Sequence, residues 1–184
     1  MSHVLVPLAQ GCEELEAITI TDLLVRAGIQ ITTAGLDDLP VTASRGTRII
    51  PNTTLDQIMD QSFDMVVLPG GQPGANNLRD DGRVQQLLKR HAAENKYVAA
   101  ICAAPAVLAA ADLLDGKTAT AFPGTLEAIK NPAINISAKD IEIDGKIITS
   151  RGPGTAMDFA LTLIEILAGK AQCEKVNAQL VRNN

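Results

Sequence analysis

The sequence predicts one α/β domain, in which helices cover both faces of a mainly parallel β-sheet. Short apolar runs at residues 4–9, 65–69 and 97–101 are typical of buried parallel strands. Helical patterns separate these runs. Aromatic residues make up only 2% of the chain although 46% is hydrophobic, so the core is built from Val, Ile, Leu and Ala. A length of 184 residues indicates one domain over residues 1–184.

The first elements form a β-α-β unit. Residues 4–9 predict a strand with Pro7 near its carboxyl end, because proline has no N–H to donate to a sheet. Residues 13–27 predict a helix that is acidic in its first turn and ends at Gly28. Residues 29–34 alternate as a second strand. Such a unit implies parallel pairing with a right-handed crossover.

The middle of the chain is less regular. Residues 41–43 and 48–50 predict a small β-hairpin, and Asn52 or Thr53 is expected to cap a short helix that reaches Met59. The remaining elements follow the same periodicity rules. They are a strand at 65–69, a helix at 82–95, a strand at 97–101, a helix at 105–111, a strand at 117–121, a hairpin at 141–149, and helices at 155–168 and 170–181.

Composition excludes several classes of function. The net charge is −5 and the basic residues are scattered, so a nucleic-acid partner is not expected. The longest apolar run is too short to span a membrane, and no signal peptide is expected. The cysteines Cys12, Cys102 and Cys173 are far apart and form no C-x-x-C pair. We therefore expect no disulfide framework, metal or cofactor, and a reducing cytoplasmic location.

Cys102 lies where a buried strand meets an alanine-rich helix that begins near Pro105. The N-terminus of a helix carries unpaired N–H groups and a partial positive charge, which favour a thiolate over a thiol. This position predicts a reactive cysteine. The alternative is an ordinary buried cysteine, since free cysteine is among the most buried residue types.

Glycine- and alanine-rich turns are expected beside Cys102. In open parallel sheets the carboxyl ends of the strands meet at one edge, where ligands bind. The turns that contain Gly11, Gly70–Gly71 and Ala103 all follow predicted strands. The N–H groups of Gly71 and Ala103 are candidate donors to an oxyanion. The alternatives are an ordinary turn or a phosphate-binding loop, although neither common glycine-rich nucleotide motif is matched.

Glu16 is the candidate proton carrier. Glu13 and Glu14 are expected to be solvated partners of the helix dipole. Glu16, in contrast, shares the sheet-facing stripe of its helix with Ile20, so it is expected to be partly desolvated with a raised pKa. A carboxyl group in this state can hold and transfer a proton.

Four separated motifs resemble the DJ-1/ThiJ/PfpI superfamily, and in particular its DJ-1-like branch. They run in order over nearly the whole chain. The motifs are Ala9-Gln10-Gly11-Cys12-Glu13-Glu14-Leu15-Glu16, Leu68-Pro69-Gly70-Gly71, Ala100-Ile101-Cys102-Ala103-Ala104-Pro105 and Ser150-Arg151-Gly152-Pro153-Gly154-Thr155. The resemblance implies a flavodoxin-like three-layer α/β/α sandwich and a homodimer.

The resemblance also implies roles for particular residues. Cys102 becomes the easily oxidised nucleophile at a strained turn, with Glu16 as its protonated partner. Gly71 and Ala103 become the oxyanion donors. The expected substrate pocket adds Gly70, Arg26, Arg45, Phe122 and Pro153. Arg26 and Arg45 match arginines near the family's site entrance, where Arg45 is expected to reach across a dimer. Both arginines are otherwise read as solvated surface residues.

The sequence departs from relatives of this superfamily at two positions. Protease-like members have histidine directly after the cysteine, where this chain has Ala103, so peptide hydrolysis is not expected. Some glyoxalase-active relatives have a histidine where this chain has Phe122. Cys12 is interpreted as a small apolar filler, with a second oxidisable thiol as the alternative. For Cys173, the sequence indicates no partner residue.

The resulting first hypothesis is cysteine-dependent detoxification or repair of reactive carbonyls, of the glyoxalase III or deglycase type, in oxidative-stress defence. The substrate is expected to be methylglyoxal or its early adducts. The second hypothesis is a redox sensor or holdase chaperone, which acts through oxidation of Cys102 without turnover.

Overall fold

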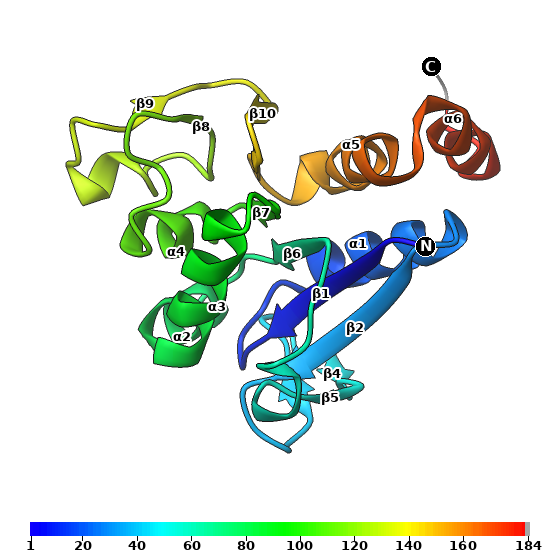
Figure 1. Ribbon diagram of the computed structural model, residues 1–184, viewed down its shortest axis with the longest axis horizontal. Helices are drawn as coiled ribbons and strands as arrows, with labels where there is room; N and C mark the ends of the chain where they lie inside the picture. The colour runs from blue at the N-terminus through cyan, green and yellow to red at the C-terminus, as the bar shows by residue number, and fades with distance from the viewer. Residues whose placement is uncertain (183–184) are drawn as a thin grey trace.

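A seven-stranded sheet forms the centre of the molecule. The structure is a computed structural model, and it describes residues 1–182. The strands lie in the order β10, β11, β7, β6, β1, β2, β5 (Figure 1). Their bounds are β1 (His3–Leu8), β2 (Gln30–Gly35), β5 (Thr53–Thr54), β6 (Met65–Leu68), β7 (Tyr97–Ile101), β10 (Ile141–Asp144) and β11 (Ile147–Ser150).

Pairing within this sheet is parallel except at one edge. Leu5 of β1 is in register with Thr32 of β2, and Val66 of β6 is in register with Val98 of β7. Only the β10–β11 pair is antiparallel. From β1 the chain builds outward through β2 and β5, and then returns to place β6 and β7 on the other side of β1. The order therefore reverses between β1 and β6, and ligands bind at such a reversal in open α/β sheets.

Helices cover both faces of the sheet, as predicted. The side chains of Val4 and Val6 contact one helical layer and Leu5 contacts the other, which is the period-two alternation of a strand buried on both faces. One layer contains α1 (Glu14–Arg26), α5 (Ala156–Ala168) and α6 (Lys170–Gln179). The other contains α2 (Gly74–Asp80), α3 (Gly82–Ala93) and α4 (Pro105–Ala110). This is a flavodoxin-like α/β/α sandwich.

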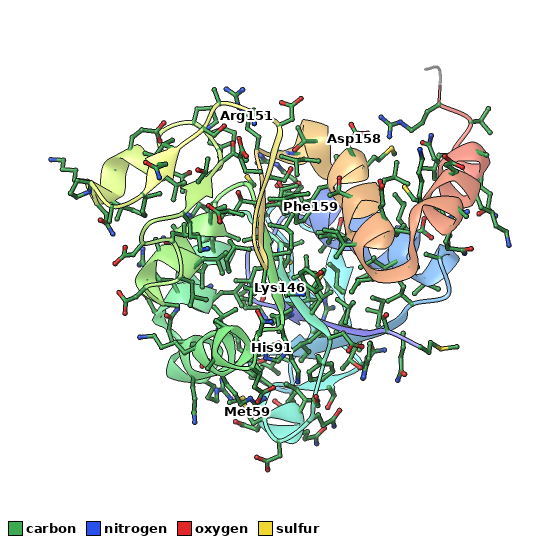
Figure 2. The ribbon with its side chains drawn as sticks, turned by 45° about the horizontal axis from the view of Figure 1, so that its top comes forward. Met59, His91, Lys146, Arg151, Asp158 and Phe159 are labelled. Atoms are coloured by element: carbon green, nitrogen blue, oxygen red, sulfur yellow. The ribbon has the colours of Figure 1, made fainter. Side chains whose placement is uncertain are left out.

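Figure 2 labels a buried side chain in each helical layer. Phe159 of α5 is fully buried in the layer that also contains α1. His91 of α3 is buried in the opposite layer. Among residues 1–182, no helix is both long and apolar enough to cross a membrane.

Small elements flank the main sheet. The predicted hairpin is present as β3 (Val41–Thr42) paired with β4 (Arg48–Ile49). A further two-stranded sheet joins β8 (Thr118–Ala119) to β9 (Asn135–Ile136) in parallel. Short 3-10 turns occupy Asp56–Ile58, Glu127–Ile129 and Pro153–Thr155.

Two local predictions were wrong. The helix expected from Asn52 or Thr53 to Met59 is instead β5 followed by one 3-10 turn, because Thr53 and Thr54 pair with the edge of β2. The helix α2 was not predicted. Its sequence, Gly-Ala-Asn-Asn-Leu-Arg-Asp, has few strong helix formers, and it is held by packing of Ala75 and Leu78 into the core.

Candidate functional site: a cysteine and a glutamate at the carboxyl edge of the sheet

Cys102 directly follows β7 and lies in a left-handed backbone conformation, with φ of 64°. A non-glycine residue in this region is strained, so the surrounding structure must hold it there. Two backbone hydrogen bonds do so. Its N–H donates to the carbonyl oxygen of Ser150 at 2.9 Å, and its carbonyl oxygen accepts from the N–H of Phe122 at 2.8 Å. The residue is 8% exposed. Cys102 is therefore a fixed thiol with limited access to solvent.

Glycines allow the loop after β6 to approach this turn. A Cβ atom on Gly70 would lie only 2.7 Å from Cβ of Cys102 and 2.8 Å from the carbonyl oxygen of Ile101. Gly71 has φ of 88°, and a Cβ atom there would overlap the amide nitrogen of Glu13. Side chains at these positions would push the β6 loop away from both Cys102 and the start of α1.

The N–H groups of Gly71 and Ala103 both approach the Cys102 sulfur. A hydrogen bond from each of these N–H groups acts to lower the pKa of the thiol. An oxyanion that forms on a carbon bound to this sulfur would lie near the same groups.

Glu16 lies in the first turn of α1 and is 0% exposed. Its Oε2 accepts a hydrogen bond from the N–H of Gly70 at 2.8 Å. Its Oε1 is buried and has no hydrogen-bond partner among residues 1–182. Burial raises the pKa of Glu16 to about 7, although the N–H of Gly70 and the thiol of Cys102 act to lower it. The carboxyl group thus changes protonation near neutrality.

The expectation that the start of α4 lowers the pKa of Cys102 is not met. Burial and the negative charge of Glu16 raise the pKa of this thiol to about 12. The helix has only six residues and begins at Pro105, which has no N–H, so its dipole has little effect beside these two causes. Ionisation of Cys102 is consequently coupled to Glu16, because a protonated Glu16 no longer repels a thiolate.

A cavity of about 360 Å³ opens on the Cys102 sulfur. It contains most of the predicted pocket residues, while Glu16 and Gly70 are buried next to Cys102 behind its wall. The lining residues are Glu13, Ser44, Arg45, Gly71, Gln72, Cys102, Ala103, Phe122, Thr125 and Pro153. Arg45 is exposed at the rim, and its guanidinium forms no ion pair within the described part of this chain.

Arg26 is not brought to this cavity. It is the last residue of α1, whereas Glu16 lies in the first turn of the same helix. The Arg26 guanidinium instead pairs with Asp22 one turn earlier, at 2.8 Å on an exposed face. Within a single chain, Arg26 is therefore not part of the predicted substrate pocket.

Glu13 and Glu14 anchor the hairpin loop that carries Arg45. The hydroxyl of Ser44 donates to Glu13 at 2.7 Å, and the N–H of Arg45 donates to Glu14 at 3.0 Å. Burial acts to raise the pKa of Glu14, but hydrogen bonds from N–H groups, including that of Arg45, lower it to about 2. These glutamates were expected to be merely solvated. Their partners come from a loop about 30 residues later, so helix periodicity gave no signal for them.

The other cysteines do not contact the cavity. Cys12 is buried in the core beneath α1, and burial together with the charge of Glu14 raises its pKa to about 11. The thiol of Cys173 donates to the carbonyl oxygen of Leu161 at 3.3 Å. All three cysteines are free. Within residues 1–182, no group of three or more His, Cys, Asp or Glu side chains is arranged to hold a metal ion.

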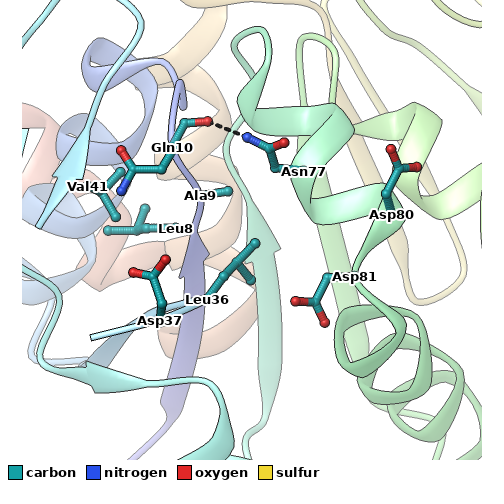
Figure 3. Close-up of a pocket in the computed structure, with 9 residues that line it drawn as sticks. All are labelled: Leu8, Ala9, Gln10, Leu36, Asp37, Val41, Asn77, Asp80 and Asp81. Atoms are coloured by element: carbon teal, nitrogen blue, oxygen red, sulfur yellow. Dashed lines mark hydrogen bonds between the residues drawn. The ribbon is translucent and has the colours of Figure 1, made fainter. Parts of the chain in front are cut away.

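A second cavity, of about 400 Å³, lies near the end of β1 (Figure 3). Its acidic side chains already have partners. Asp80 pairs with Arg79, and Asp81 pairs with Arg83. The amide of Asn77 donates to the carbonyl oxygen of Gln10 at 2.8 Å. Its walls are partly polar and partly apolar, and its lining contains no cysteine, serine or histidine, so the candidate reactive site is the one at Cys102.

The fold and site together define a flavodoxin-like α/β protein with a cysteine–glutamate pair at the carboxyl edge of its sheet. Comparison with protein families identifies the family to which the chain belongs. The model of the DJ-1/PfpI family matches residues 2–166. The chain belongs to the DJ-1/PfpI family, and its relatives place it in the DJ-1-like branch.

Several relatives align over nearly the whole chain. Protein dj-1beta of Drosophila melanogaster is 44% identical over 173 residues, covering 94% of this chain and 92% of the relative. A protein of Caenorhabditis elegans named glutathione-independent glyoxalase DJR-1.2 is 34% identical, with coverages of 93% and 89%. The chain spans only 41% of the longer DJ-1 homolog B of Arabidopsis thaliana, to which it is 39% identical.

Two solved structures of DJ-1 proteins are also similar to this chain over its whole length. The crystal structure of Drosophila melanogaster DJ-1beta superimposes with a TM-score of 0.96 at 42% identity, and both chains are covered fully. The structure of oxidized DJ-1 of Toxoplasma gondii gives a TM-score of 0.95 at 39% identity, again with full coverage of both chains.

Proposed function

We propose that this protein converts small 2-oxoaldehydes such as methylglyoxal into 2-hydroxy acids, with Cys102 as the nucleophile. The observation that carries the proposal is the position of the Cys102 sulfur. It faces a cavity, lies beside the N–H groups of Gly71 and Ala103, and adjoins a buried carboxyl group with a pKa of about 7. The C. elegans relative named as a glyoxalase supports the same chemistry.

The first step is addition of sulfur to the aldehyde. The thiol of Cys102 and the carboxyl group of Glu16 together lose one proton near neutrality. Glu16 holds the remaining proton when Cys102 reacts as a thiolate. The sulfur electron pair forms a bond to the aldehyde carbon, and the carbonyl oxygen becomes an oxyanion. The N–H groups of Gly71 and Ala103 stabilise that oxyanion. Glu16 then gives its proton to the oxygen, which yields a hemithioacetal.

The second step moves hydrogen within the bound substrate. The Glu16 carboxylate removes the hydrogen of the former aldehyde carbon as a proton and returns a proton to the neighbouring ketone carbon. The hydroxyl proton of the hemithioacetal passes to the ketone oxygen in the same step. The first carbon is thereby oxidised to a thioester, and the second is reduced to a hydroxyl-bearing carbon. Water hydrolyses the thioester, which releases the 2-hydroxy acid and restores the thiol. No external oxidant is needed.

Repair of early adducts uses the same first intermediate. Cys102 would take over the aldehyde carbon of a hemithioacetal or hemiaminal, while the original thiol or amine leaves with a proton. Adduct loss should be measured at a constant concentration of free methylglyoxal. If the rate depends only on the free aldehyde, the enzyme acts on the aldehyde and adduct repair is excluded.

The test of the main proposal is the Cys102→Ser variant, with Cys173→Ser as the matched control. Methylglyoxal loss and lactate formation should both disappear in Cys102→Ser, because a serine hydroxyl is not ionised near neutrality. Both should persist in Cys173→Ser, whose thiol lies on the last helix. Undiminished turnover by the purified Cys102→Ser protein would overturn the mechanism.

We propose oxidation sensing as the second candidate, with or without holdase chaperone activity. Oε1 of Glu16 has no hydrogen-bond partner within residues 1–182, and when protonated it would donate a hydrogen bond to a sulfinate on Cys102. The T. gondii relative, whose structure is that of an oxidized DJ-1, supports this second candidate. Mass spectrometry after mild peroxide treatment tests it. Selective gain of two oxygens at Cys102, with no aldehyde turnover, would favour sensing over catalysis.

We further propose a cytoplasmic homodimer joined through α1. Three apolar side chains, Leu15, Ile18 and Val25, are each about half exposed on the helix face away from the core. A second copy would cover them. Ile18→Asp should shift the molecular mass measured by light scattering from dimer to monomer, whereas Ile143→Asp on β10 should not. A wild-type protein that is monomeric at all concentrations would exclude the dimer.

A further inference from the structure

We propose that Phe122 is a specificity-determining residue, which makes the site prefer 2-oxoaldehydes with an aryl group over methylglyoxal. This inference rests on the proposed function, because it assumes that Cys102 adds to an aldehyde. Phe122 lines the Cys102 cavity, and 51% of the residue remains exposed. A large aromatic side chain left half open at a cavity wall presents apolar surface that a ligand can bury.

A backbone hydrogen bond holds Phe122 next to Cys102. The N–H of Phe122 donates to the carbonyl oxygen of Cys102 at 2.8 Å, so the two residues are joined directly. Behind the ring lies Gly152, on which a Cβ atom would stand 3.6 Å from Cδ2 of Phe122. Pro153 lines the same cavity directly after Gly152. Phe122 therefore forms an apolar side of the cavity together with Pro153 and packs next to Gly152.

The cavity is larger than a three-carbon aldehyde requires. Its volume is about 360 Å³, which falls in the range of roughly 300–1,000 Å³ typical of pockets for drug-sized ligands. Methylglyoxal bound at Cys102 would leave most of this space to water. A substituent on the ketone carbon has room to extend from the sulfur towards the mouth of the cavity.

The chemical character of the walls favours an aryl substituent. Glu13 and Arg45 provide the charged part of the lining, whereas Ala103, Phe122 and Pro153 provide the apolar part. Phe122 has no titratable group, so it does not add a second proton carrier beside Glu16. Its contribution is contact surface, and stacked aromatic pairs gain stabilisation beyond burial alone.

The reaction of such a substrate follows the steps above without change. Sulfur adds to the aldehyde carbon of phenylglyoxal, a proton moves from this carbon to the ketone carbon, and water hydrolyses the thioester. The product is mandelate, whereas methylglyoxal gives lactate. In both cases the internal oxidation and reduction balance.

The first test compares kcat/KM for phenylglyoxal and methylglyoxal in the wild type, Phe122→Ala and Phe122→Leu. We expect the ratio of the two values to fall about three- to tenfold in Phe122→Ala. Phe122→Leu should give a smaller decrease, since it keeps apolar surface but not the ring. Ile143→Ala, which removes a similarly exposed apolar side chain on β10, should leave the ratio unchanged. An unchanged ratio in both Phe122 variants would overturn the inference.

The second test does not depend on turnover. Cys102 is alkylated with iodoacetamide in the presence of mandelate or lactate, and the modified peptide is quantified by mass spectrometry. Mandelate should protect the wild type at a lower concentration than lactate, and Phe122→Ala should remove most of this difference. Equal protection by the two acids would exclude an aryl subsite.

The two proposals fail in different ways. If neither aldehyde is consumed in a Cys102-dependent reaction, the proposed function is wrong, while the protection assay still reports on ligand contact at Phe122. If both aldehydes are consumed but Phe122 does not affect the ratio, only the inference about specificity is wrong. Phenylglyoxal also modifies arginine, so intact mass after the assay must show that Arg45 is unmodified.

Discussion

The carboxylate of Glu16 accepts a hydrogen bond from the N–H of Gly70, 54 residues later in the chain, at 2.8 Å. This contact ties the first turn of α1 to the loop after β6, and both segments then meet Cys102. The bond uses one carboxylate oxygen and leaves Oε1 free of hydrogen bonds within residues 1–182. Glu16 is therefore held in place by the backbone while retaining an oxygen for proton transfer.

Replacement of Glu16 by Gln should shift the pH profile of Cys102 alkylation. In the wild type, the pair loses its first proton with a pKa of about 7 at Glu16. Reactivity should therefore rise through neutrality. In Glu16→Gln the thiol ionises alone, and burial keeps its pKa above the ordinary value of 9.0. The rise in alkylation near pH 7 should therefore disappear, and only the rise at higher pH that belongs to the buried thiol should remain. Superimposable profiles would show that Glu16 does not share its proton with Cys102.

The same variant should be more stable than the wild type at alkaline pH. The pKa of Glu16 is raised from 4.5 to about 7 on folding, so the native state binds more protons than the unfolded state between these values. The stability of the wild type consequently rises as the pH falls through this range. Above pH 7 the buried charge costs roughly 3 kcal/mol.

Urea unfolding at pH 8 and pH 4.5 measures this difference. Glu16→Gln should exceed the wild type in free energy of unfolding by about 2–3 kcal/mol at the higher pH, and by little at the lower one. Glu165→Gln on α5 serves as a control for removal of a carboxylate elsewhere. A loss of stability in Glu16→Gln at both pH values would contradict the buried-charge argument.

Gly70→Ala should abolish turnover and lower stability. The new methyl group would need the place of Cβ of Cys102 and of the Ile101 carbonyl oxygen, both of which lie within 2.8 Å. The strained turn would shift, and the Gly70 N–H would move away from Glu16. Gly82→Ala is the matched control, because nothing lies within 4 Å of its added Cβ atom and it stands at the start of α3. Lactate formation and thermal unfolding should separate the two variants, and full activity of Gly70→Ala would refute the packing argument.

His91 should make the protein acid-sensitive. It is buried against Phe63, with both ring nitrogens unpartnered among the described residues. Burial and the nearby positive charges of Lys96 and Arg90 lower its pKa below 6.5, although the backbone of Leu87 and the charge of Glu94 act in the opposite direction. The unfolded state therefore binds the proton more readily, and stability is lost as the pH falls below about 6.5.

Thermal unfolding between pH 7 and pH 5 tests this expectation in the Glu16→Gln background, which removes the opposite effect of Glu16. The midpoint should fall with decreasing pH when His91 is present. The decrease should be smaller in the double variant Glu16→Gln/His91→Leu. Parallel curves for the two proteins would show that His91 does not titrate in this range.

Arg45 and Arg26 should differ in their effect on turnover. Arg45 lines the Cys102 cavity, so Arg45→Ala is expected to raise KM severalfold without changing the pH profile of alkylation. Arg26→Ala removes an exposed pair with Asp22, and such surface pairs contribute less than about 1 kcal/mol. Kinetics of methylglyoxal consumption compare the variants. A larger effect of Arg26→Ala would indicate that this residue reaches a site in another copy.

Periodicity in the sequence was sufficient for most of the framework. Apolar runs located β1, β6 and β7, and the shared stripe with Ile20 indicated that Glu16 is buried. These features depend on neighbours within one element. β5 could not be found in this way, because Thr53 and Thr54 pair with a strand about 20 residues earlier.

In the site too, some features are set by residues adjacent in the sequence and others by contacts between distant segments. The turn at Cys102 follows from a strand, small residues and a proline that are adjacent in the sequence. The pKa of its thiol depends on Glu16, and the loop of Arg45 depends on Glu13 and Glu14. Such contacts join segments that only the folded chain brings together. Arg26 was misplaced because it ends α1, at the opposite end of the helix from Glu16.

The bond between the Cys102 N–H and the Ser150 carbonyl oxygen has a consequence for biosynthesis. Cys102 cannot adopt its final conformation on a ribosome until β11 has emerged and docked beside β7. An unfinished chain thus holds an ordinary thiol, and the strained turn and raised pKa of Cys102 arise only at completion of the sheet.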